Sequence, residues 1–324
     1  MKILITGATG LIGRQILNNL LSVNQEIFLL VRDINSLDDD VAANKKIKIF
    51  VGDISKRGLG LNARDLNFIR HNVEVVFHCA ALYNTHAKWV ELAKNNLTAT
   101  KNIISFLKSC SKKPILNYLS TLYVCGNFTG VFPEDFLPSI KSFHNQYERS
   151  KYVTERYVRG VYTRANIFRV PMVVGDSRTG NTSKFDGVYR VFDLATKSKV
   201  FVYPGAATGR LEILPVDFVA DFIVSSGLDD KRVGVTYNMV SGDKLRYHTL
   251  FDCVLKIVKY DGIVIRIPGV LWKFVPKFGA LNMFNQDIEF VSENFNRKMH
   301  ELDLNAPNVD LYLKNVINYY KSNS

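Results

Sequence analysis

The chain has 324 residues, 47% of them hydrophobic, which is enough for one large α/β domain and a smaller second lobe. Its formal net charge of +12 favours an anionic partner, such as a nucleic acid, a membrane surface, a phosphorylated cofactor or an acidic carrier protein. The basic residues are scattered and no zinc-finger or RNA-binding signature accompanies them, which argues against nucleic acid.

The cysteines and the N-terminus predict a reducing compartment. Cys79, Cys110, Cys125 and Cys253 are widely separated and form no Cys-x-x-Cys pair, so no metal site is expected. A hydrophobic strand that starts at Lys2 leaves no room for a signal peptide, which predicts a cytoplasmic protein. Charged residues and prolines interrupt the apolar region 263–284, so we expect no membrane span there; peripheral membrane contact or an acyl-binding lobe stays open.

The first stretch of the chain, residues 2–21, predicts a buried strand, a glycine turn and an amphipathic helix. Gly7, Gly10 and Gly13 allow a sharp turn, close approach of a pyrophosphate and tight packing of the helix on the strand. Their spacing is Gly-x-x-Gly-x-x-Gly rather than Gly-x-Gly-x-x-Gly, and many glycine turns do nothing but turn. The position between a strand and a helix nevertheless predicts dinucleotide binding.

A second strand over 26–33 ends where a Rossmann fold meets the adenosine ribose. An acidic side chain there binds the ribose hydroxyls of NAD, whereas an arginine binds the 2′-phosphate of NADP. Arg32 precedes Asp33, and Arg14 lies just past the glycine turn, so we predict NADP(H) in preference to NAD(H). The alternative is that both arginines are solvated surface charges.

Two further strands follow, over 48–54 and 74–81. The first ends in Asp53 and Ile54, which suit the edge and face of an adenine; Asp53 capping the next turn is an equal alternative. The second ends in two alanines, against which a ring or ribose can lie. With a helix from Asn95 to Cys110 and a strand over 114–120, the alternation predicts a doubly wound parallel sheet with helices on both faces.

A candidate catalytic group follows the fifth strand. Tyr147 and Lys151 are four residues apart on a predicted helix and therefore share a face. A phenol is a poor proton donor at neutral pH unless a nearby cation stabilises its phenolate, as an ammonium one turn away can do. The hydroxyl of Thr121 can hydrogen-bond the same substrate oxygen. Tyr-x-x-x-Lys alone is usually a solvated helix face, but with the glycine turn and Ser120-Thr121 it predicts carbonyl chemistry.

The sequence resembles the extended short-chain dehydrogenase/reductases over nearly its whole length. The matching segments are residues 6–13, Gly52-Asp53, 78–81, 95–100, Ser120-Thr121, 147–151 and 214–220. This resemblance implies a Rossmann domain with a smaller C-terminal substrate lobe. It also implies that Thr121 binds the substrate oxygen, that Tyr147 is the general acid/base, and that Lys151 binds the nicotinamide ribose; whether Ser120 shares the role of Thr121 stays open.

On the same basis, we expect one set of residues to hold the cofactor. The set is Gly7, Thr9, Gly10, Leu11, Ile12, Gly13, Arg14, Arg32, Asp53, Ile54, Ala80, Ala81, Asn96, Tyr147, Lys151, Pro171 and Val173.

Residues 169–180 look most like the branch that contains thioester reductase domains and fatty acyl-CoA reductases. That resemblance implies an NADPH-dependent reductase of a carrier-bound or CoA-bound acyl thioester, or of its aldehyde, with an acidic acyl carrier protein as partner. The same family contains nucleotide-sugar epimerases and dehydratases and hydroxysteroid-type dehydrogenases, which are the first alternative. A non-catalytic dinucleotide-binding protein is the second. The oligomeric state, including a homodimer, stays open.

The C-terminal part is expected to form mainly a small α/β substrate lobe. Helices are predicted over 185–199, 218–228 and 308–320, and a flexible loop over 205–209. Strands are predicted over 212–216, which we expect to return to the central sheet, and over 235–240. The aromatic region 263–284 suits a lipid-like acyl chain with an anionic head, or is an ordinary lobe core. We therefore expect an NADP-binding Rossmann domain over 1–180 and a substrate lobe over 181–324, with segments near 211–240 returning to the Rossmann domain.

Overall fold

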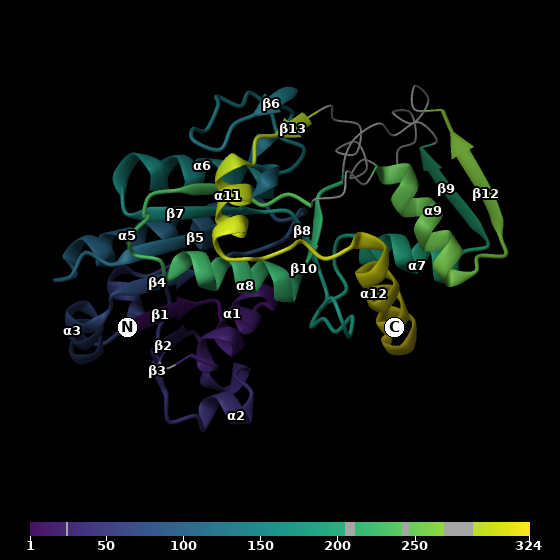
Figure 1. Cartoon of the computed structure of the whole chain (residues 1–324). Helices are drawn as coiled ribbons and strands as arrows, with labels where there is room; N and C mark the ends of the chain where they lie inside the picture. The colour runs from purple at the N-terminus through teal and green to yellow at the C-terminus, as the bar shows by residue number, and fades with distance from the viewer. Residues whose placement is uncertain (24, 205–210, 242–245, 269–287) are drawn as a thin grey trace.

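A computed structural model describes residues 1–23, 25–204, 211–241, 246–268 and 288–324 of the chain. A large parallel sheet with helices on both faces forms most of the molecule, and a smaller lobe lies beside it, on the right of Figure 1. The predicted flexible loop and most of the aromatic region 263–284 lie outside the described residues.

The central sheet has seven strands in the order β11-β7-β5-β4-β1-β2-β3. Every neighbouring pair is parallel, which confirms the doubly wound α/β prediction. The strands are β1 (Lys2–Thr6), β2 (Glu26–Val31), β3 (Ile47–Val51), β4 (Val75–His78), β5 (Ile115–Thr121), β7 (Ala165–Val170) and β11 (Thr236–Asn238).

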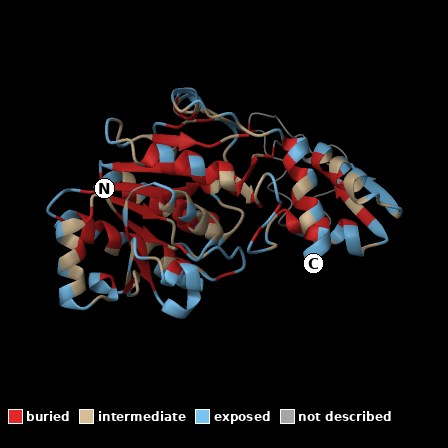
Figure 2. Ribbon diagram, turned by 60° about the horizontal axis from the view of Figure 1, so that its bottom comes forward, coloured by how far each residue is buried: buried red, intermediate tan, exposed pale blue. Residues whose placement is uncertain are grey.

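Both faces of this sheet are buried, because successive side chains of each strand point to opposite faces. On one face Ile3 and Ile5 belong to a core that includes α1 (Leu11–Leu21) and α8 (Val216–Gly227). Leu4 belongs to the opposite core. That core includes residues of α3 (Ala63–Asn72), α5 (Ala99–Ser109) and α6 (Gln146–Val161). Figure 2 shows these buried strands in red.

The helix predicted from Asn95 begins earlier than expected. Its helical backbone starts with α4 (Trp89–Leu92), widens into a π-helical segment (Ala93–Thr98) and continues as α5. The wide turn contains Asn96, which is 2% exposed. A π-helical turn is rare and frequently marks a functional region.

Pro171 divides the strand region that follows α6. Since proline has no backbone N–H, β7 ends at Val170, and a new short strand, β8 (Met172–Val174), pairs with β10 (Ile213–Pro215). The expectation that residues 212–216 return to the central sheet is therefore wrong: they form a separate two-stranded sheet. β11 is the later segment that joins the central sheet, beside β7.

The smaller lobe has its own aromatic core. It is built from α7 (Tyr189–Lys197), β9 (Val200–Pro204), α9 (Tyr247–Val258), β12 (Ile263–Ile267) and α12 (Val309–Asn323). Tyr189, Phe192 and Tyr320 pack together in it with ring centroids 5.3 to 6.0 Å apart. None of the helices in the described part of the chain has the length and apolar content needed to cross a bilayer.

The remaining short elements connect these layers. They are the helical turns Ile34–Ser36, Arg57–Gly60 and Leu122–Cys125, the helices α2 (Asp39–Ala42) and α11 (Glu293–Glu301), and the strands β6 (Gly130–Phe132) and β13 (Ile288–Phe290), which pair with each other.

Candidate functional site

The glycine turn after β1 has steric requirements that only glycine meets. Gly7 has a φ of +78°, and a Cβ there would lie 2.5 Å from the backbone nitrogen of Ala80. A Cβ at Gly13 would lie 2.0 Å from the carbonyl oxygen of Gly7. These two glycines therefore let the turn and α1 pack against the end of β4.

Gly10 differs, because a Cβ there would meet its nearest neighbour, the Gly7 oxygen, at an ordinary 3.4 Å. Gly10 is the N-cap of α1, no side chain caps this helix, and its first turn contains no acidic residue. The N-terminus of α1 thus keeps backbone donors and a positive dipole end for an anion. Gly7, Gly10 and Gly13, which we call the glycine cradle, and the N-terminus of α1 together fit the pyrophosphate of a dinucleotide.

The residues predicted to bind the adenosine end of the cofactor follow the glycine turn, β2 and β3. Arg14 forms an ion pair with Asp38, with Nη2 and Oδ1 3.1 Å apart, and Arg32 is exposed. Asp53 accepts a hydrogen bond from the backbone of Ser55 at 2.9 Å, which is the turn-capping geometry. Although burial raises the pKa of Asp53, hydrogen bonds from the backbone and side chain of Ser55 and the charges of Lys56 and Arg32 together lower that pKa below its ordinary value.

Asn96 uses its whole side-chain amide within the protein. Its Oδ1 accepts from the backbone N–H of Leu82 at 2.7 Å, and its Nδ2 donates to the Leu82 carbonyl at 3.2 Å and to Ser150 Oγ at 2.9 Å. It thereby joins the loop after β4 to α6. Its predicted contact with a cofactor stays a prediction, as do those of Ala80, Ala81, Ile54, Pro171 and Val173.

The end of β5 separates two neighbouring hydroxyl groups. Ser120 Oγ donates to the buried carboxylate of Glu155 at 2.6 Å, whereas Thr121 Oγ accepts from the backbone N–H of Tyr123 at 3.3 Å. Because adjacent strand residues face opposite sides of the sheet, only one of them can face a ligand on a given side. Ser120 is held by Glu155, and the role of Thr121 toward a substrate stays a prediction.

Glu155 is the centre of a buried ionic network. Its carboxylate pairs with Arg169 of β7 at 2.8 Å and with Arg159 at 2.9 Å, and both Glu155 and Arg169 have fully buried side chains. Although burial raises the pKa of Glu155, the charges and hydrogen bonds of Arg169, Arg159 and Ser120 together outweigh it and keep that pKa below its ordinary value. This network was not predicted from the sequence, although an arginine in the middle of an apolar strand is a recognisable sign of a buried partner.

Helix α6 brings Tyr147 and Lys151 to the carboxyl end of the sheet. Asn145 caps this helix by accepting from the backbone N–H of Glu148 at 2.9 Å. Lys151 is 3% exposed, donates from Nζ to the Leu119 carbonyl at 2.6 Å, and lies 4.5 Å from the ring centroid of Tyr118. Burial lowers the pKa of Lys151 to about 8, although the charge of Glu155 opposes this shift.

Tyr147 packs against a second aromatic ring. Its ring stands edge-on to that of Tyr83 with the centroids 4.9 Å apart. Burial raises the pKa of Tyr147 well above its ordinary value, and Tyr83 and Glu148 raise it further. The Lys151 ammonium donates to the Leu119 carbonyl here, so its expected effect on the acidity of this phenol stays a prediction.

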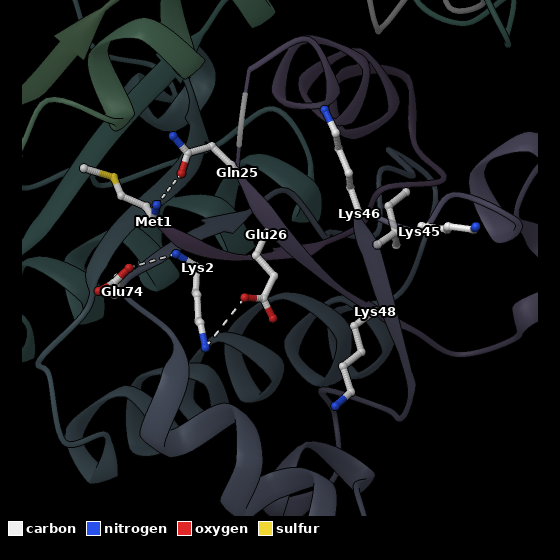
Figure 3. A pocket seen from close by; sticks show the side chains of 9 residues that line it. Met1, Lys2, Gln25, Glu26, Lys45, Lys46, Lys48 and Glu74 are labelled. Atoms are coloured by element: carbon white, nitrogen blue, oxygen red, sulfur yellow. Dashed lines mark hydrogen bonds and ion pairs between the residues drawn. The ribbon is translucent and has the colours of Figure 1, made fainter.

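A groove lies at the other end of the sheet. Figure 3 shows it at the start of β1, β2 and β3, lined in part by Lys2, Glu26, Lys45, Lys46 and Glu74. Open parallel sheets bind ligands at the carboxyl ends of their strands, so we do not assign the site to this groove. Among the described residues, no group of three His, Cys, Asp or Glu side chains could hold a metal ion.

Comparison with known proteins adds family information to this geometry. The sequence model of the family described as male sterility protein matches residues 5–223. The chain is 27% identical over 281 residues to one of the linear gramicidin synthase proteins of Brevibacillus parabrevis, a match that covers 78% of this chain and 5% of that protein. It is 28% identical over 269 residues to aldehyde reductase lnbA from Aspergillus flavus, covering 74% of this chain and 26% of that protein.

The chain thus spans about a quarter or less of the length of these curated relatives. Among solved structures, the terminal R domain from the myxalamid PKS-NRPS biosynthetic pathway matches 99% of this chain and 89% of its own, with a TM-score of 0.81 and 23% identity. At that identity the likeness establishes the shared fold.

Proposed function

The chain belongs to the male sterility protein family, an NAD(P)-dependent oxidoreductase family with the extended short-chain dehydrogenase/reductase fold, and from this premise we propose that it is an NADPH-dependent reductase. The substrate that we propose is an acyl thioester on a carrier protein or coenzyme A, or the derived aldehyde. The observation that carries the proposal is the position of Lys151, a buried ammonium beside the end of β5 and one helical turn from Tyr147.

A dinucleotide bound along the glycine cradle would supply the hydride, and the chain would supply the proton and the orientation. In this proposal the Thr121 hydroxyl donates to the carbonyl oxygen of the substrate and orients it. Tyr147 gives its phenolic proton to that oxygen as negative charge develops there. Because burial raises the pKa of Tyr147, this proton transfer depends on the charge of Lys151 to stabilise the phenolate.

Lys151 would act as a binding and electrostatic group. At neutral pH the Lys151 side chain is charged in most of the protein molecules, because its pKa is lowered only to about 8. An ammonium in this buried position can donate to the hydroxyls of a nicotinamide ribose and stabilise negative charge on the Tyr147 oxygen once it forms. Asn96 hydrogen-bonds Leu82 and Ser150, the residue before Lys151, and so joins α6 to the loop after β4.

We propose NADP(H) as the cofactor because two arginines lie at the adenosine end of the cradle. Arg14 follows the glycine turn directly, and Arg32 follows β2, the strand that leads to the ribose in Rossmann folds. Guanidinium groups suit a 2′-phosphate, which accepts paired hydrogen bonds and carries up to two negative charges.

Two observations support the carrier-bound substrate. One relative is named a linear gramicidin synthase, the R domain structure is named for a PKS-NRPS biosynthetic pathway, and lnbA is named an aldehyde reductase. The net charge of +12 also complements an acidic carrier protein or the phosphates of coenzyme A. We assign residues 1–180 to cofactor binding and residues 181–324 mainly to the substrate lobe.

The test is to incubate the protein with NADPH and a panel of acyl-CoAs, carrier-bound thioesters, aldehydes, ketones and a nucleotide sugar. The loss of reduced-nicotinamide absorbance and the products are then followed. We expect oxidation of NADPH with a thioester or an aldehyde. Tightly held NAD with turnover of the nucleotide sugar would instead favour an epimerase, and NADPH binding without turnover of any compound would favour a non-catalytic protein.

A further inference from the structure

We infer that Asp38 is a specificity-determining residue that competes with the 2′-phosphate of the cofactor for the guanidinium of Arg14. This inference rests on the proposed preference for NADPH and goes beyond it, because it assigns a residue that weakens the preference. The carboxylate and the phosphate are both anions that need the same cation, so the ion pair has to open before the phosphate can use Arg14.

The ion pair between Arg14 and Asp38 lies beside the glycine cradle. The backbone N–H of Arg14 donates to the carbonyl of Gly10 at 2.8 Å, so its side chain leaves α1 within one turn of the proposed pyrophosphate site. Asp38 approaches from the segment after β2 and holds Arg14 at 3.1 Å. Both side chains line a small pocket with Ala8, Thr9, Ser36 and Leu37. The pocket therefore joins the glycine turn to the segment that follows β2.

The ion pair is exposed enough to be exchanged. The side chains of Arg14 and Asp38 are 41% and 49% exposed, and ion pairs this accessible to water are weak. A 2′-phosphate carries more charge than one carboxylate and can accept hydrogen bonds from two N–H groups of the guanidinium. Binding of NADP(H) can thus displace Asp38, but it has to break the ion pair between Arg14 and Asp38. NAD(H) has no 2′-phosphate and leaves that ion pair in place.

Asp38 is distinct from the other aspartates of this segment. Asp33 accepts from the backbone N–H of Asn35 at 3.0 Å and thereby caps a helical turn. Asp39 and Asp40 lie in the first turn of α2. Asp38 is the N-cap of α2 but makes no side-chain capping hydrogen bond, and asparagine is an equally good N-cap. Asp38→Asn therefore removes the charge while keeping the local backbone, and Asp39→Asn is a matched control.

The experiment measures the dissociation constants of NADP⁺ and NAD⁺ by calorimetry, with thermal unfolding of each variant to verify its fold. In Asp38→Asn we expect the Kd for NADP⁺ to fall about three- to fivefold, the range that an exposed ion pair can supply, while the Kd for NAD⁺ stays within about twofold. Asp39→Asn is expected to change both constants less than about twofold. In an Arg14→Gln background, Asp38→Asn should no longer tighten NADP⁺, because the contested cation is absent.

Two results would overturn the inference: an unchanged NADP⁺ affinity in Asp38→Asn, or the same gain in the Arg14→Gln background and in Asp39→Asn. The cofactor proposal is tested separately by the wild-type protein. If wild type binds NAD⁺ as tightly as NADP⁺ and Arg14→Gln leaves both unchanged, the preference for NADPH is wrong, whatever Asp38→Asn does.

Discussion

Lys151 should make the stability of this protein rise with pH on the alkaline side. Its pKa is lowered from 10.5 to about 8, because burial disfavours the charged ammonium. Between those values the unfolded chain binds a proton that the folded chain does not, so the free energy of unfolding increases with pH there. Below pH 8 Lys151 is charged in the folded protein, and burying this charge lowers the free energy of unfolding by about 3 kcal/mol for a shift of this size.

The perturbation is Lys151→Met, which keeps much of the side-chain volume and removes the charge. Urea unfolding of both proteins at pH 7, 8, 9 and 10 gives the difference in their free energies of unfolding, in which the other titrating groups cancel. We expect wild type to gain about 2 kcal/mol relative to the variant between pH 7 and pH 10. An exposed-site control, Lys45→Met, should show no such trend. A wild-type-minus-Lys151→Met difference that is independent of pH would refute the electrostatic account of this lysine.

Three further outcomes follow from the structure. Gly13→Ala puts a Cβ 2.0 Å from a carbonyl oxygen, so thermal unfolding should show a loss of about 1 to 3 kcal/mol, together with weaker dinucleotide binding. Glu155→Gln leaves the buried Arg169 without its carboxylate and should cost about 3 to 5 kcal/mol in urea unfolding; an unchanged midpoint would contradict the network. Burial lowers the pKa of His78 to about 3, so below pH 6.5 the unfolded chain binds a proton that the fold excludes. Between pH 6.5 and about 3, the free energy of unfolding should therefore decrease by about 1.4 kcal/mol for each unit by which the pH is lowered. His78→Asn should flatten this slope.

The sequence predicted the central sheet well, because its signals are local. The apolar run of β1, the glycines after it and the spacing of α1 each reflect neighbours within a few residues. The one error in the predicted sheet, the placement of residues 212–216, has a non-local cause. The chain at Pro171 leaves β7 and starts β8, and the partner of β8 is β10, some forty residues later. No periodicity within either strand specifies that pairing.

The helical spacing of the candidate site residues could be predicted from the sequence, but their electrostatics could not. Helical spacing places Tyr147 and Lys151 on one face of α6, and the structure agrees. The pKa of each group depends on burial by distant segments, which the pattern does not contain. The choice between Ser120 and Thr121 likewise depends on Glu155, which lies 35 residues further along the chain.

The most direct measurement of the central claim compares wild type with Tyr147→Phe. Each is mixed with NADPH and the best thioester or aldehyde from the panel, and the dissociation constant for NADPH is measured in parallel. We expect Tyr147→Phe to bind NADPH within about threefold of wild type and to lose at least about a hundredfold in turnover, as expected when a general acid is removed. Turnover by Tyr147→Phe close to that of wild type would show that the proton comes from another group.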